Sequence, residues 1–189
     1  MSEHKENTKM ELHDWLHCIV TAVVIGIFVF VFIGRQIGVQ GDSMNPTLRN
    51  SDRVVMSRLF YTPRSGDIVV FRSDPYGTEP FVKRVMAVAG QTIDIDFATG
   101  DVIVDGVVLY EPYISELTMR RNGFEGPVQV PEGYVFVLGD NRNNSRDSRD
   151  ADIGLVDIRY ILGRVMFILV PGDSPYSPRE WSRIGRIRS

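Results

Sequence analysis

The hydrophobic and polar positions divide the chain into one long apolar segment and a series of short apolar runs. Residues 15–34 contain no Asp, Glu, Lys or Arg. A helix of this length would span about 30 Å at 1.5 Å per residue, which is the thickness of a bilayer core. Because the segment is apolar on every side, it is typical of a membrane span rather than of a buried core helix.

A cleavable signal peptide has a basic start, a shorter apolar core and a small-residue cleavage site. The N-terminal segment has none of these clearly, so we predict a single retained transmembrane helix over residues 15–34, behind a polar tail of residues 1–14. The flanking charges leave its orientation open, because Lys5 and Lys9 precede the segment and Arg35 follows it.

The rest of the chain has the period and turn residues of short strands. The predicted strands are Ile37–Gln40, Arg53–Met56, Asp67–Phe71, Phe81–Val88, Thr92–Ile95, Val102–Val104, Val107–Tyr110, Val128–Val130, Tyr134–Leu138 and Ile161–Val170. Many short strands favour a mainly β fold, with an antiparallel, partly barrel-like domain over residues 35–175. Residues 176–189 form a basic tail, for which two interpretations stay open: it lies on an anionic membrane surface, or it is a frayed soluble end.

Composition narrows the chemistry of this β domain. The net charge of −3 gives no electrostatic case for nucleic acid. All three histidines and the only cysteine, Cys18, precede Arg35. The domain therefore has no residues for a Ser-His-Asp triad, a Cys-His dyad or a zinc site with His or Cys ligands, and we expect no metal and no cofactor.

Lys83 is the only lysine after Lys9. Strand alternation places it on one face with Phe81 and Val85, which we predict to be buried, and places Arg84 on the other face. A desolvated lysine can lose its proton, whereas an arginine effectively cannot. Taken alone, this stretch is more typical of a lysine whose stem reaches out to water.

Two polar segments stand out among the strands. In the first, residues 41–48, Ser43 lies between Gly41 and Pro46 on a predicted turn that would expose its hydroxyl, although a lone serine in such a place usually caps the turn. The second, residues 139–150, contains no apolar side chain and is either a solvated loop or a loop of orienting groups. An ion pair between Asp147 and Arg149 would fix it.

Together these segments suggest a nucleophile and its base. A serine nucleophile needs a group that takes its proton, and the domain has no histidine. Lysine at its reference pKa of about 10.4 is a poor base at neutral pH, but burial would lower the pKa of Lys83 towards about 8.

These segments resemble the boxes of bacterial type I signal peptidase, in its small Gram-positive form. Gly41-Asp-Ser-Met-Asn-Pro-Thr-Leu48 is similar to the nucleophile box, and Gly66-Asp-Ile-Val-Val-Phe-Arg72 to the next. Val82-Lys-Arg-Val85 is similar to the lysine box, and residues 139–149 to the last. The four boxes occur in the family's order.

The resemblance implies a serine–lysine dyad, with Ser43 as the nucleophile and Lys83 as the general base. It implies that Ser145 hydrogen-bonds the Lys83 amine while Asp147 and Arg149 brace the loop. The residues that it places at the oxyanion hole and substrate cleft are Gly41, Asp42, Met44, Pro46, Arg84, Asp140 and Asn141. Larger members have a serine where this chain has Gly41, so a second oxyanion donor is not assigned.

The function implied is a membrane-anchored serine endopeptidase that removes N-terminal signal peptides from exported preproteins. Its partners would be preproteins with small residues at the first and third positions before the cut, and membrane lipid. The resemblance places the N-terminus in the cytoplasm and the β domain outside. Two alternatives share the fold: a dedicated processing peptidase, or a non-enzymatic assembly factor, for one secreted filament or pilus subunit. A cytosolic self-cleaving repressor is disfavoured by the apolar segment and the lack of a helix-turn-helix pattern.

Overall fold

The computed structural model describes residues 13–27, 35–72, 79–173 and 179–187, in two compact units, Met1–Arg35 and Gln36–Ser189. The first unit is described as one helix over residues 13–27, with exposed side chains. None of the helices in the described ranges combines the length and apolarity needed to span a bilayer. Of the predicted transmembrane helix, residues 15–27 are helical and residues 28–34 lie outside the described residues. The span therefore stays a prediction.

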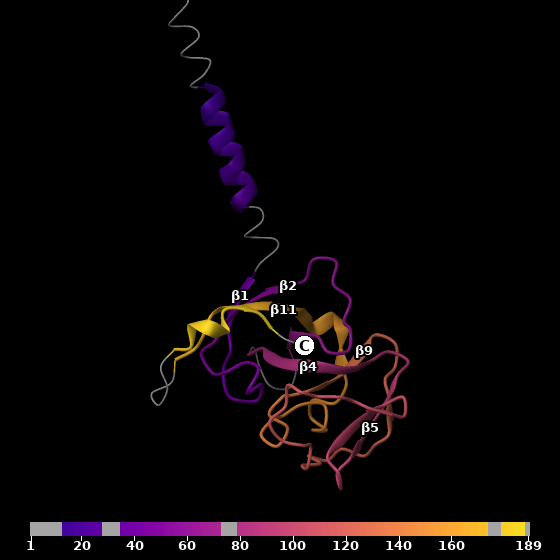
Figure 1. Ribbon diagram of the computed structural model, residues 1–189. Helices are drawn as coiled ribbons and strands as arrows, with labels where there is room; N and C mark the ends of the chain where they lie inside the picture. Colours follow the sequence, from indigo (N-terminus) through magenta and orange to yellow (C-terminus); the bar gives the residue numbers. More distant parts are fainter. Residues whose placement is uncertain (1–12, 28–34, 73–78, 174–178, 188–189) are drawn as a thin grey trace, which may run out of the picture. The chain divides into compact units, whose positions relative to one another are not determined.

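The second unit is built from two antiparallel sheets (Figure 1). The larger has the order β1-β2-β11-β3-β4-β9-β10, with β12 paired to β11; its strands are β1 Arg35–Gly38, β2 Arg53–Ser57, β3 Ile68–Phe71, β4 Phe81–Val88, β9 Tyr134–Leu138, β10 Val156–Asp157, β11 Ile161–Val170 and β12 Gly185–Arg186. The smaller has the order β7-β6-β5-β8, with β5 Thr92–Asp96, β6 Asp101–Val104, β7 Val107–Val108 and β8 Val128–Gln129. The short 3₁₀ helices are η1 Ile158–Tyr160 and η2 Trp181–Arg183. The prediction of a mainly β, antiparallel domain is confirmed.

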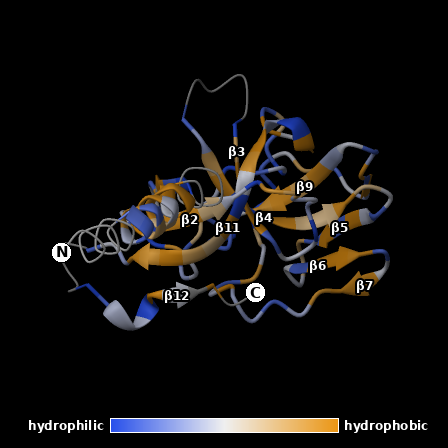
Figure 2. Ribbon diagram, turned by 90° about the horizontal axis from the view of Figure 1, so that it is seen from above, coloured by the Kyte–Doolittle hydropathy of each residue, from blue (hydrophilic) through white to orange (hydrophobic). Residues whose placement is uncertain are grey.

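Three strands have the predicted bounds. These are β4, β9 and β11, none of which is an edge strand of the larger sheet. The register of β11 against β2 shifts between Val165 and Phe167 and again between Ile168 and Val170, as expected where a long strand bends. Figure 2 shows hydrophobic residues along both sheets and polar residues in many of the connecting loops.

The prediction for β4 needs one correction. We expected Lys83 on a buried face and Arg84 on the opposite face, but both side chains are buried, with 3% and 0% exposure. The strand lies between β3 and β9 and is covered on both sides. Because both faces of β4 are covered, the side chains at odd and at even positions are buried alike.

The C-terminal segment is folded over its described residues 179–187. Helix η2 is followed by β12, which pairs with β11 through Phe167–Arg186 and Ile168–Gly185. The interpretation of this part as a frayed end is therefore wrong, and the interpretation as a lipid-binding tail stays a prediction.

Candidate active site

Ser43 and Lys83 meet although 40 positions separate them in the sequence. The Lys83 Nζ donates a hydrogen bond to the Ser43 Oγ over 2.7 Å and another to the Val82 carbonyl over 3.0 Å. Strand β4 supplies the lysine, directly opposite Val69 of β3. The serine comes from the turn of residues 41–50, which joins β1 to β2.

The surroundings of Lys83 favour the neutral amine. Burial lowers the pKa of Lys83 to about 8. The carboxylates of Asp147 and Asp140 act in the opposite direction, and the charge of Arg149 adds to the lowering. With a pKa near this value, about one amine in ten is unprotonated at pH 7, which is sufficient for a general base.

The loop of residues 139–150 holds the serine turn from one side. The backbone N–H of Asn141 donates to the Ser43 carbonyl over 3.0 Å, and the Asn141 Nδ2 donates to the Asp42 carbonyl over 3.1 Å. The Thr47 hydroxyl donates to Asp140 over 2.5 Å. Three contacts along the turn therefore fix its position relative to the loop.

Asp140 also forms an ion pair with Arg84 through two hydrogen bonds. The Nε and Nη2 of Arg84 donate to its two oxygens over 2.8 and 2.7 Å, and both side chains are fully buried. The Arg84 guanidinium lies 3.7 Å from the centre of the Tyr113 ring. Arg84, Asp140 and Asn141 were predicted at the cleft, but they do not line it. They join β4, the loop and the serine turn instead.

Asp147 and Arg149 form the predicted ion pair, at 2.8 and 2.9 Å, and both are fully buried. Asp147 also accepts the N–H of Gly139 over 3.0 Å, while Arg149 donates to the carbonyl of Arg142 over 2.6 Å. The ion pair therefore links the end of the loop to its start at Gly139 and to its middle at Arg142.

Ser145 does not make the expected hydrogen bond to Lys83. Its hydroxyl is buried and has no hydrogen-bond partner among the described residues. A Cβ at Gly139 would collide with this hydroxyl and with the Ser43 carbonyl, so a glycine is needed where the loop passes the turn. Ser145 thus lies close to the serine turn without orienting the lysine.

The buried ion pair of Arg142 with Glu111 was not predicted from the sequence. Arg142 is fully buried and donates to both oxygens of Glu111, at 2.8 and 2.5 Å, and to the Thr118 hydroxyl at 2.9 Å. These contacts anchor the loop to residues 111–118, an irregular segment in which no periodic pattern marks Glu111.

A cleft of about 680 Å³ opens at the dyad. It is lined by residues 37–44, which include Gly41, Asp42 and Met44, and by residues 79–83, Asn144 and Arg146, whereas Pro46 does not line it. That this cleft receives the substrate stays a prediction. In the ranges that the structure describes, no group of three His, Cys, Asp or Glu residues is suited to a metal ion.

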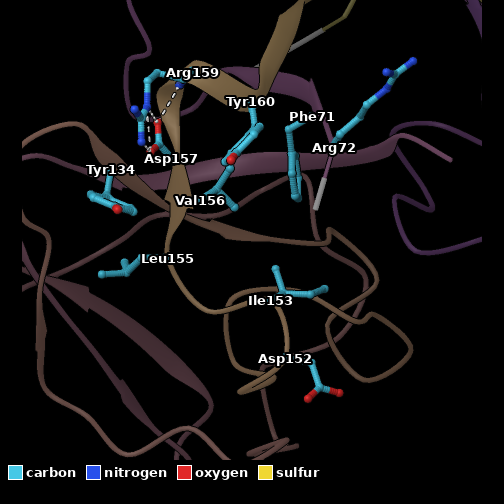
Figure 3. Close-up of a pocket in the computed structure, with 10 residues that line it drawn as sticks. All are labelled: Phe71, Arg72, Tyr134, Asp152, Ile153, Leu155, Val156, Asp157, Arg159 and Tyr160. Atoms are coloured by element: carbon cyan, nitrogen blue, oxygen red, sulfur yellow. Dashed lines mark hydrogen bonds and ion pairs between the residues drawn. The ribbon is translucent and has the colours of Figure 1, made fainter. Parts of the chain in front are cut away.

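A second depression, of about 340 Å³, is lined by Tyr134, Val156 and Tyr160 together with the Asp157–Arg159 ion pair (Figure 3). It includes neither residue of the dyad.

Comparisons with known proteins show which family the chain resembles. The model of the family described as "Signal peptidase, peptidase S26" matches residues 12–170. Signal peptidase I of Bacillus licheniformis is 35% identical, over 90% of this chain and 96% of the relative, and signal peptidase I S of Bacillus subtilis is 34% identical over the same shares. A solved signal peptidase I from Enterococcus faecalis is 30% identical with a TM-score of 0.47, over 55% of this chain and 97% of that chain. The family match and the two Bacillus relatives show that the chain belongs to the signal peptidase I family.

Proposed function

We propose that the chain is a membrane-anchored serine endopeptidase that removes N-terminal signal peptides from exported preproteins. The observation that carries the proposal is the 2.7 Å contact between the Ser43 Oγ and a buried lysine amine whose pKa is about 8. A dyad of this kind supplies both a nucleophile and a base that is neutral at working pH.

The reaction begins with the unprotonated Lys83 amine taking the proton of the Ser43 hydroxyl. The Oγ attacks the carbonyl carbon of the scissile bond, and Lys83 returns the proton to the departing amine, which leaves an acyl-enzyme. Lys83 then takes a proton from water, whose oxygen attacks the ester. The same proton passes to the Ser43 Oγ as the ester bond breaks, which frees the serine and releases the signal peptide with a new carboxyl terminus.

The oxyanion formed in each step needs a fixed donor. The backbone N–H of Ser43 is the donor that we propose, because it is rigidly attached to the nucleophile and the Ser43 carbonyl on its other side is held by Asn141. The substrate would lie extended in the cleft beside β1, an edge strand of the larger sheet, and small residues at the first and third positions before the cut would fit against it.

The N-terminal segment is proposed as the anchor. Residues 15–34 are long enough and apolar enough in sequence to cross a bilayer as a helix, and residues 15–27 are helical in the structure. We propose that the N-terminus faces the cytoplasm and the β domain lies on the outer side, where exported preproteins emerge.

The proposal is tested with the full chain in detergent or lipid and several unrelated secretory preproteins. We expect cleavage after small-x-small sites, identified by N-terminal sequencing. Ser43→Ala and Lys83→Ala should each lower the rate by at least about 1,000-fold while circular dichroism shows a folded domain. If the folded wild type cuts none of the preproteins, or if Lys83→Ala keeps full activity, the proposal is wrong.

A further inference from the structure

The C-terminal segment contacts the turn that carries the nucleophile. Arg183, in η2, donates through Nη1 and Nη2 to the carboxylate of Asp52 over 3.0 and 2.6 Å. Its Nη2 also reaches the carbonyl of Thr47 at 3.3 Å. One guanidinium therefore holds two points of the chain just after Ser43.

Asp52 is the centre of this junction. It is fully buried, and its carboxylate also accepts the N–H groups of Arg49 over 2.8 Å and Gly172 over 2.6 Å. Gly172 lies just after β11 in the sequence and packs against the serine turn. A Cβ at this position would collide with the carbonyl of Asn50. The carboxylate thus joins the serine turn, the end of β11 and η2.

The turn is held from two sides as a result. Asn141 and Asp140 hold it through Asp42, Ser43 and Thr47, and the C-terminal segment holds it through Thr47 and Asp52. Ile187, at the end of that segment, packs on the same hydrophobic cluster as Met44 and Leu48 of the turn.

We propose that Arg183 is a positioning residue for Ser43, so that the C-terminal segment completes the active site. This inference rests on the proposed function. Without Arg183 the Asp52 carboxylate would be a buried charge with no cation, a costly state that the turn would relieve by moving towards water. A displacement of about 1 Å at a reacting group can cost about 100-fold in rate.

The test compares Arg183→Ala with Arg179→Ala in the full chain, with kcat expressed per titrated active site. Arg179 belongs to the same segment, but it pairs with Asp173 at 3.2 Å and lies against Trp181. Within the described part of the chain it makes no hydrogen bond to the turn. For Arg183→Ala we expect kcat to fall by about 10- to 100-fold, with KM within about threefold. The alkaline pKa of the rate profile should stay near 8, because Arg183 does not touch Lys83. For Arg179→Ala we expect kcat within about twofold of wild type.

Hydrogen–deuterium exchange gives a readout independent of activity. The N–H groups of Leu48 and Arg49 bond within the turn and to Asp52, so Arg183→Ala should speed their exchange, while the amides of β4 should not change. If the wild type cleaves no preprotein, the exchange rates still show whether Arg183 holds the serine turn. The two proposals can therefore fail separately.

If Arg183→Ala does not fold, Arg183→Lys tests the positioning role of Arg183 instead. A lysine keeps the charge but lacks the guanidinium's fork, so it cannot hold Asp52 and Thr47 in the same way, and we expect an intermediate kcat and intermediate exchange. Wild-type kcat together with wild-type exchange in this variant would overturn the inference. Equal losses of kcat in Arg183→Ala and Arg179→Ala would also overturn it.

Discussion

The chemistry at the residue scale depends on one amine. Lys83 is buried against the Ser43 hydroxyl, and Lys83→Arg would keep a long basic side chain but remove the amine that can lose its proton. An arginine keeps its proton at any working pH. We expect this variant to lose about 100- to 10,000-fold in kcat, the usual contribution of a general base, when cleavage of a preprotein is followed by gel densitometry. Substantial activity in Lys83→Arg would show that another group takes the serine proton.

The pKa of Lys83 also predicts the pH dependence of the rate. If the unprotonated Lys83 amine is the base, as proposed, kcat/KM should rise about tenfold per pH unit below pH 8 and level off above about pH 9. The profile is measured from pH 6 to 10 with one preprotein. A flat profile over this range would contradict the assignment of Lys83 as base.

Burial of Lys83 should also make stability depend on pH. Its folded pKa of about 8 lies below the unfolded value of 10.5, so between these pH values the unfolded chain binds more protons. The contribution of Lys83 to the free energy of unfolding is therefore least favourable below pH 8 and improves as the pH rises to about 10.5. We expect Lys83→Met to be more stable than wild type at pH 6, with a smaller advantage at pH 10, in urea unfolding. An advantage that is constant with pH would contradict this linkage.

At the scale of elements, the loop of residues 139–150 and the serine turn work as a pair. Asn141→Ala removes the Nδ2 contact to the Asp42 carbonyl, and we expect kcat to fall about tenfold as the turn loosens. Asn143→Ala is a matched control, since that side chain bonds residues 116–120 rather than the turn. We expect the control to keep kcat within about twofold in the same cleavage assay. If the two variants lose equal activity, the contact of Asn141 with the serine turn has no specific effect on kcat, and the loop supports activity only by keeping the domain folded.

The elements also show how far a sequence can be interpreted. The apolar runs predicted β4, β9 and β11 with their bounds, because each is a run of five or more residues rich in β-branched, aromatic and other apolar side chains. The two-residue strands β10 and β12 carry no such pattern, and they form only because a longer neighbour presents its edge.

Within the site, the sequence predicted an ion pair between close neighbours in the chain, but it did not predict ion pairs between residues far apart in the chain. The Asp147–Arg149 pair was predictable because the two residues are neighbours on one loop. The hold of Arg183 on Asp52 joins positions 131 apart, and no local pattern marks either partner. The burial of Arg84 was missed because alternation assumes one solvated face, and β4 has none.

At the scale of the whole molecule, the two compact units suggest a division of tasks. The dyad, the bracing loop and the C-terminal segment all lie within Gln36–Ser189, so the chemistry should not need the N-terminal unit. We expect a chain of residues 35–189, which keeps all of β1, to cleave a short soluble peptide with kcat/KM within about threefold of the full chain.

The same truncation should behave differently towards a membrane-bound substrate. If residues 15–34 anchor the enzyme, they place it on the same surface as the preprotein and raise its effective concentration there. With a preprotein reconstituted in liposomes, we expect the truncated chain to be slower than the full chain by about 10- to 100-fold. Equal rates on liposomes, with equal rates on the peptide, would contradict the anchor while leaving the dyad intact. A loss on both substrates would show instead that the N-terminal unit supports the catalytic domain itself.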